Sequence, residues 1–179
     1  MNIFGESLIL SKIAIKYLGF IYKIECDQDL WYYEKTIHLD KNVVREEYIA
    51  KIKACEKPTS YDFVVTLAAN QNRIGLAQIW CNHEIRRTWE IGFAILPEYS
   101  GKGYGCEAAQ LLLQFAFERL HAHKVVGMCH TQNKRSGAVM KHIGMTKEAT
   151  FKEELFWHDQ WVDQDYFSIL EKEYFENSR

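Results

Sequence analysis

Three alternating glycines stand between a predicted strand and a predicted helix in the segment from Pro97 to Ala109, which reads PEYSGKGYGCEAA. This placement constrains the fold because the chain must leave a strand, make a turn that favours glycine and enter a helix within a few residues. Several backbone N–H groups are thereby exposed at the positive end of a helix, where a phosphate binds without basic side chains. The segment predicts a phosphate-binding loop or, as the alternative, a tight strand-to-helix turn that binds nothing.

The spacing of the glycines narrows the kind of phosphate ligand. Gly101, Gly103 and Gly105 form the pattern GxGxG. The Walker pattern GxxxxGK[ST] is absent, and the dinucleotide fingerprint requires GxGxxG. The loop is therefore typical of neither nucleotide-binding class.

The strand before the glycines, expected over Arg87–Leu96, has two different faces because side chains alternate along a strand. One face carries the large apolar side chains of Trp89, Ile91, Phe93 and Ile95. The other face is small in its middle and consists of Glu90, Gly92, Ala94 and Leu96. The small residues leave room for a slender ligand that runs from the glycine loop along the strand, or for a large neighbour such as a helix.

The whole chain, residues 1–179, reads as a single domain of strands and helices. Apolar residues at helical spacing predict helices over Lys16–Cys26, Val44–Cys55, Cys106–His121 and Ser136–Ile143. In the second of these we expect Glu46 and Glu47 in the first turn, where carboxylates suit the helix dipole. Strand-like runs cover Ser7–Ile13, Asp62–Ala68, Arg73–Asn82, Arg87–Leu96, Lys124–His130, Thr150–Trp157 and Val162–Leu170. This order predicts an α+β (mixed α/β) fold, with helices against the faces of a mixed sheet.

Composition excludes several classes of protein. The 22 basic and 24 acidic side chains give a net charge of −2, which argues against binding to a nucleic-acid backbone. No apolar run approaches the roughly 20 residues of a membrane span, and the first residues lack the features of a signal peptide. The five cysteines form no CxxC pair, so we expect reduced thiols, no metal site and a cytoplasmic protein.

Three motifs in order carry a family resemblance: Glu90-Ile-Gly-Phe93, the glycine loop, and Asn133-Lys-Arg-Ser-Gly-Ala-Val-Met-Lys-His-Ile-Gly-Met145. On these motifs the sequence resembles the GNAT (GCN5-related) N-acetyltransferase superfamily, and more narrowly its ribosomal-protein alanine N-acetyltransferase (RimJ/RimL-like) branch. The resemblance implies the GNAT fold, with a central, mostly antiparallel sheet of six or seven strands and about four helices. It also implies acetyl-CoA as cosubstrate and direct attack by an amine in a ternary complex.

The resemblance also assigns cofactor-binding residues. The family motif Q/R-x-x-G-x-G/A matches here with Ser100 in place of Gln or Arg, so one side-chain contact is lost while the backbone cradle is kept. Pantetheine is expected beside Ile95 and Leu96, with Asn133 and Ser136 on the other side of the cofactor. The pyrophosphate is expected at Ser100, Gly101, Lys102, Gly103, Tyr104, Gly105 and Cys106.

Acyl transfer needs a neutral amine, a donor to the developing oxyanion and a proton for the departing thiolate. Glu90 is the first candidate for the base, acting through water; the alternative is a structural carboxylate paired with Arg86 or Arg87. Glu153 and Glu154 are further candidates, because the resemblance places a base on the same strand.

For the acid, many relatives have a tyrosine seven residues after the asparagine, where this chain has Met140. Ser136 is then the candidate, with a helix N-cap or first-turn role as the alternative. Cys106 at a helix start could be a nucleophile, but no histidine is adjacent and the plain thiol is the preferred interpretation.

The acceptor side is expected near the first two helices and the final hairpin. Trp31, Tyr32 and Trp157 there form an apolar or cation-binding wall or, alternatively, part of the core. The chain has no strongly acidic segment of the sort that would select a polyamine. The resemblance implies a protein or peptide α-amine, or a small amine, as the acceptor, and we expect a monomer or homodimer. The alternatives are a non-catalytic CoA-binding regulatory module, an acetyltransferase of polyamine- or antibiotic-type amines, and an interaction domain without cofactor.

Overall fold

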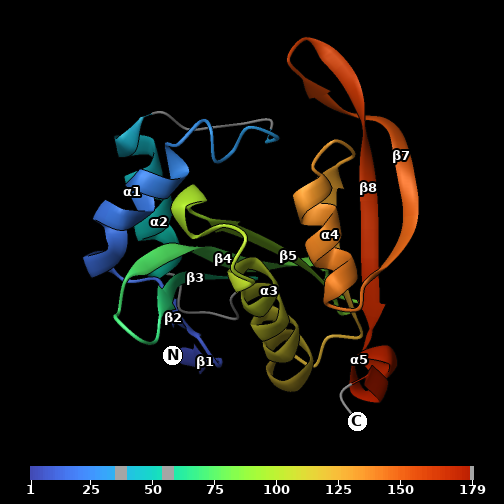
Figure 1. The fold of residues 1–179 in the computed structure, drawn as a ribbon, viewed down its shortest axis with the longest axis horizontal. Coiled ribbons are helices and arrows are strands. Elements are labelled where there is room, and N and C mark those ends of the chain that lie inside the picture. The colour runs from blue at the N-terminus through green and yellow to red at the C-terminus, as the bar shows by residue number, and fades with distance from the viewer. Residues whose placement is uncertain (35–39, 54–58, 178–179) are drawn as a thin grey trace.

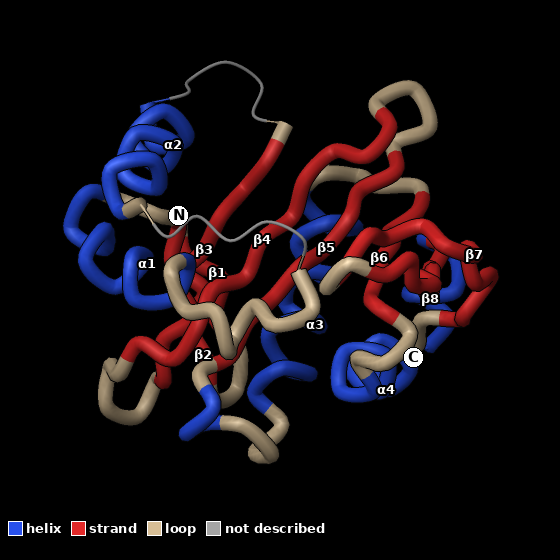
Figure 2. The backbone as a smooth tube through the Cα atoms, turned by 90° about the horizontal axis from the view of Figure 1, so that it is seen from above, coloured by secondary structure: helices blue, strands red, loops and turns tan. Residues whose placement is uncertain are grey.

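The computed structural model describes residues 1–34, 40–53 and 59–177. Within these ranges eight strands form one sheet in the order β1-β2-β3-β4-β5-β6-β8-β7 (Figures 1 and 2). All neighbours are antiparallel except β5 and β6. The strands are β1 Asn2–Phe4, β2 Leu8–Lys12, β3 Ser60–Leu67, β4 Arg73–His83, β5 Thr88–Ile95, β6 Lys124–His130, β7 Thr146–Trp157 and β8 Gln160–Leu170.

Helices cover both faces of the sheet (Figure 1). On one face α1 (Leu18–Glu25) and α2 (Lys41–Lys53) enclose a core cluster with β3, β4 and β5. On the other face α3 (Tyr104–Gln114) and α4 (Lys134–His142) enclose the larger cluster, and α5 (Glu171–Asn177) follows β8. No helix in these ranges combines the length and the apolar character needed to cross a membrane.

The α+β fold with a mixed sheet is confirmed, and several details of the sequence prediction were wrong. The sheet has eight strands because the three-residue β1 is too short to show a period. Helix α2 begins at Lys41, so Glu46 and Glu47 lie in its second turn. The helix expected to reach His121 changes to a π-helical turn over Phe115–Arg119.

Four cysteines are free thiols, and Cys55 lies outside the described residues.

The parallel pairing of β5 with β6 is short, and this positions the site. Only Thr88–Glu90 pair with Lys124–Val126. Beyond this point β5 pairs only with β4, and β6 pairs only with β8. The sheet is therefore open between the end of β5 and the end of β6, with Glu90 at the vertex of the opening.

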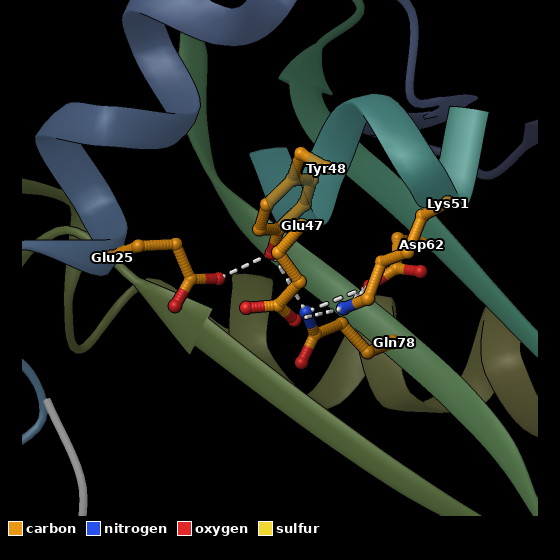
Figure 3. A network of polar contacts seen from close by, with 6 residues as sticks. All are labelled: Glu25, Glu47, Tyr48, Lys51, Asp62 and Gln78. Carbon is orange, nitrogen blue, oxygen red and sulfur yellow. Dashed lines mark hydrogen bonds and ion pairs between the residues drawn. The ribbon is translucent and has the colours of Figure 1, made fainter. Parts of the chain in front are cut away.

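A polar network ties α1 and α2 to the sheet beneath them (Figure 3). The Tyr48 hydroxyl of α2 donates to Glu25 at the end of α1. Gln78 of β4 donates from one Nε2 to the Tyr48 oxygen (3.0 Å) and to Asp62 of β3 (2.9 Å). Lys51 pairs with Asp62 at 3.3 Å. The network fixes the end of α1, from which the segment that approaches the open side of the sheet departs.

Candidate active site

A cavity of about 530 Å³ lies beside the open end of β5. Four stretches of chain line it: residues 29–34 after α1, residues 93–95 of β5, the glycine loop with the start of α3, and the start of α4. These stretches are far apart in sequence. The opening of the sheet is what brings them together.

The glycine loop faces this cavity in a conformation that glycine favours. Gly101 has φ +77° and Gly103, the N-cap of α3, has φ +83°. A Cβ added to either residue would meet no atom within 4 Å, so both face open space. The first turn of α3, formed by Tyr104, Gly105 and Cys106, lines the cavity with N–H groups that lack acceptors within the helix. This cradle fits the phosphate groups of a CoA ester.

The structure places most, but not all, of the expected cofactor residues at the cavity. Ile95 and Ser100 line it. Leu96 instead packs into the core cluster under α1 and α2, because it faces the other side of the strand. The Lys102 ammonium lies 5.7 Å from the centre of the Tyr99 ring and is not part of the lining.

The space expected at Gly92 is filled, which corrects the idea of a ligand lying along the whole small face of the strand. A Cβ on Gly92 would lie 3.1 Å from the Trp80 ring of β4. The large neighbour is thus a side chain of the adjacent strand. Only Ala94 of the small face reaches the cavity.

The start of α4 contributes Asn133, Arg135 and Ser136 to the lining. The Asn133 side chain caps the helix by accepting from the Ser136 backbone N–H at 3.1 Å. Ser136 is a first-turn residue whose hydroxyl is left for other contacts. Arg135 was missed by sequence reasoning, although a basic residue beside the Asn133 motif is the signal that could have found it.

Glu90 is held by neutral partners. Asn82 of β4 donates to Glu90 Oε2 at 2.8 Å, and Trp80 also bonds its carboxylate. In the described ranges it forms no ion pair with Arg86 or Arg87. Burial raises the pKa of Glu90 above its usual value, which brings the carboxylate closer to the range of a general base.

Glu153 and Glu154 lie away from the cavity. Both are exposed on β7, where pairing with β8 is irregular between Phe151 and Leu155. The Glu153 backbone N–H donates to Asp163. Neither side chain lines the cavity.

The aromatic residues expected at the acceptor side do gather there. Trp31, Tyr32, Tyr33 and Glu34 line the cavity. The Trp157 ring lies 5.1 Å from Tyr32, and its indole N–H donates to the Tyr32 carbonyl at 2.7 Å. Sequence reasoning missed His130, whose buried ring lies 5.2 Å from Tyr33 and 4.8 Å from Trp157. We call Tyr32, Tyr33, His130 and Trp157 the aromatic clasp.

The surroundings of Cys106 and Met140 argue against a chemical role for either side chain. Burial raises the pKa of the Cys106 thiol, which is the opposite of what a thiolate nucleophile needs. Met140, where the family resemblance led us to look for a tyrosine, is buried against Gly127.

This chain is similar to known acetyltransferases. A family model described as an acetyltransferase (GNAT) domain matches residues 7–146. YnaD, an uncharacterized N-acetyltransferase of Bacillus subtilis (strain 168), is 40% identical over 87 residues, 49% of this chain and 51% of that protein. YdaF, a putative ribosomal N-acetyltransferase of the same strain, is 32% identical over 91 residues, 51% of this chain and 50% of that protein.

A spermidine N(1)-acetyltransferase of Vibrio cholerae serotype O1 is 27% identical over 110 residues, which are 62% of this chain and 64% of that protein. The chain thus spans about half to two thirds of the length of these relatives. A solved GNAT-family acetyltransferase from Bacillus anthracis has a TM-score of 0.84 and 28% identity, and the match covers 96% of this chain and 99% of that one.

Proposed function

The chain belongs to the GNAT acetyltransferase family, and on this premise we propose that it transfers the acetyl group of acetyl-CoA to an amine. The observation that carries the proposal is the opening of the sheet, which has the cavity beside it and Glu90, outside the cavity lining, at its vertex. An open phosphate cradle at Gly101 and Gly103 and a partly desolvated carboxylate at Glu90 flank the same opening in the sheet. One end suits the anionic cofactor, and the other suits an amine that must lose a proton.

The cofactor, when bound, supplies an acetyl group activated as a thioester. Gly101, Gly103 and the first turn of α3 hold its pyrophosphate with backbone N–H groups. Arg135 adds a positive charge at the cavity wall. Beyond Glu90, the edge of β5 that faces β6 has no strand partner among the residues that the structure describes, so its N–H groups are available to the thioester carbonyl oxygen and to the pantetheine amides.

The acceptor amine attacks the thioester directly: the N–C bond forms and the C–S bond breaks. Glu90, acting through water, takes the proton that the amine loses. Its raised pKa makes it a stronger base. The Ser136 hydroxyl, in the first turn of α4, supplies a hydrogen bond to the departing thiolate.

The names of the relatives differ, since one is a putative ribosomal N-acetyltransferase and another a spermidine N(1)-acetyltransferase. The comparisons therefore support membership of the GNAT family, and the ribosomal-protein branch is a finer assignment that they do not single out. We propose an amine acceptor that enters from the side of the aromatic clasp, opposite the glycine loop.

Two measurements in sequence test the proposal. Calorimetric titration with acetyl-CoA and CoA is expected to give micromolar affinity. A free-thiol assay with N-terminal peptides and small amines is then expected to show turnover. Binding without turnover of any amine would indicate a CoA-binding regulatory module, and no binding by folded protein would overturn the role of the glycine loop.

A further inference from the structure

A buried histidine at the acceptor end of the opening has one ring nitrogen without a partner. His130 is the last residue of β6, and it is 2% exposed. Its Nδ1 accepts the backbone N–H of Gln132 at 3.0 Å, so the proton of the neutral ring lies on Nε2. Within residues 1–34, 40–53 and 59–177, this buried Nε2–H has no hydrogen-bond acceptor. A buried donor without an acceptor is costly, so its presence calls for an explanation.

The side chains around the His130 ring do not supply that acceptor. The Trp157 ring lies 4.8 Å away and the Tyr33 ring 5.2 Å away, measured between ring centres. A contact between an N–H and an aromatic ring is weaker than a hydrogen bond to oxygen. Burial lowers the pKa of His130, which favours the neutral form of the ring. His130 therefore offers a ligand a hydrogen-bond donor and not a positive charge.

His130 lies behind the wall of the cavity. Its ring contacts Tyr33, which lines the cavity. Its carbonyl accepts the backbone N–H of Asn133, another lining residue, at 2.8 Å. Among the described residues the Tyr33 hydroxyl forms no hydrogen bond, so the Tyr33 ring can turn aside without breaking one. Movement of this ring would open a path from the cavity to Nε2.

The His130 ring projects from the same face of the sheet as the proposed base. Val126 of β6 pairs with Glu90 of β5, and the side chains of paired residues share a face. His130 follows Val126 by four residues on the same strand, so it projects from this face as well. Four residues of a strand span about 13 Å. Glu90 and His130 therefore suit different parts of one bound molecule.

We infer that His130 is a specificity-determining residue whose Nε2–H donates a hydrogen bond to an oxygen of the amine substrate, away from the amine that is acetylated. This inference rests on the proposed function. It names the substrate as an amine that carries an uncharged oxygen, such as an amide or hydroxyl oxygen, several atoms from the amine. A second ammonium group cannot take this place, because it has donors only.

The kinetic test compares ω-amino carboxamides of increasing chain length with n-alkylamines of the same number of non-hydrogen atoms. Wild-type protein is expected to prefer the best carboxamide over its alkylamine by about fivefold in kcat/KM, the usual effect of one hydrogen bond. His130→Phe keeps an aromatic ring but has no donor, and its preference is expected to fall to about one. The variant also loses the bond from Gln132, but this loss acts on both amines and leaves their ratio unaffected. His142→Phe, at the exposed end of α4 and outside the cavity lining, is the matched control and is expected to keep the wild-type preference.

A binding measurement separates failure of this inference from failure of the proposed function. Nuclear magnetic resonance of wild-type protein with isotope-labelled histidine, saturated with CoA, follows the Nε2–H signal of His130 without turnover. The carboxamide is expected to shift this proton downfield, as a new hydrogen bond to oxygen does, and the alkylamine is not. That result supports the inference even if no acetylation is seen, and it does not require the variant to fold.

Several results would overturn the inference and leave the proposed function intact. One is a ring proton on Nδ1 in the free protein, because Nε2 would then be an acceptor. Another is an unchanged Nε2–H signal in protein that calorimetry shows to be saturated with the carboxamide. Acetylation of both amines without a preference in the wild type, or with a preference that His130→Phe retains, would also overturn it.

Discussion

The indole N–H of Trp157 on β7 donates a 2.7 Å hydrogen bond to the backbone carbonyl of Tyr32, a residue 125 positions earlier. This bond joins the final hairpin to the segment that lines the acceptor end of the cavity. The Tyr33 ring adds contacts at the same junction, since it stacks with Trp157 and lies tilted beside His130. Hairpin and segment therefore form one wall.

Trp157→Phe is expected to weaken this wall without affecting the glycine loop. The variant loses one hydrogen bond, worth about 1 kcal/mol, while it keeps an aromatic ring. We expect the KM for the amine to rise about fivefold and the CoA affinity to stay the same. Steady-state kinetics and calorimetry check the two values. Trp161→Phe is the control, because Trp161 is 61% exposed and contacts Phe156 outside the aromatic clasp; an equal effect there would refute the role of the clasp.

Gly103→Glu is expected to abolish measurable CoA binding in a protein that still folds. Gly103 has φ +83°, which strains any other side chain by about 1 kcal/mol, and a carboxylate there would repel phosphate. Gly19→Glu on the exposed side of α1 introduces the same side chain with no atom within 4 Å of its Cβ. Calorimetry with CoA should separate the two variants. Retained affinity in folded Gly103→Glu protein would show that the loop does not bind the cofactor.

Glu90→Gln is expected to lower kcat by about 100-fold while CoA still binds. The pKa of Glu90 is raised by burial, so wild-type activity should rise with pH as the carboxyl loses its proton above its usual range. The variant should lack this limb of the pH–rate profile and respond only to the acceptor amine. A double Glu153→Gln, Glu154→Gln variant, changed outside the cavity lining, should keep wild-type kcat. If the double variant lost activity and Glu90→Gln kept wild-type kcat, the base would instead be a residue of β7.

Local features of the fold were predictable from sequence because they depend on neighbouring residues. The bounds of β6 agree at both ends, and the two faces of β5 pack against different core clusters as the alternation requires. The glycine loop could also be located, since the conformation at Gly101 and Gly103 follows from residue type.

Features that depend on tertiary placement were not predictable. The Trp80 ring fills the space at Gly92, and nothing in the strand sequence indicates which neighbour will do so. Glu34 and Glu90 look like isolated charges in a chain without an acidic segment. In the structure burial is the main cause of the raised pKa of Glu90, and the charge of Glu34, from the segment after α1, adds to it.

The polar network behind the site gives a prediction for stability and its dependence on pH. Burial raises the pKa of Glu25 above 4.5, so folding disfavours its ionised form. The stability that this group contributes is greatest below about pH 4.5 and is lost as the pH rises through the folded-state pKa. Tyr48 donates to Glu25, and a glutamine can accept the same hydrogen bond through its amide oxygen.

Glu25→Gln should therefore gain stability relative to the wild type as the pH is raised. Urea unfolding at about pH 4 and about pH 8 measures the difference, since Glu25 changes its ionisation across this range and glutamine does not. Glu46→Gln on the exposed side of α2 makes the same change in net charge and is the control for that change. If the Glu25→Gln difference did not change with pH, the Glu25 carboxyl would have the same pKa in both states, and its burial at the end of α1 would carry no ionisation cost.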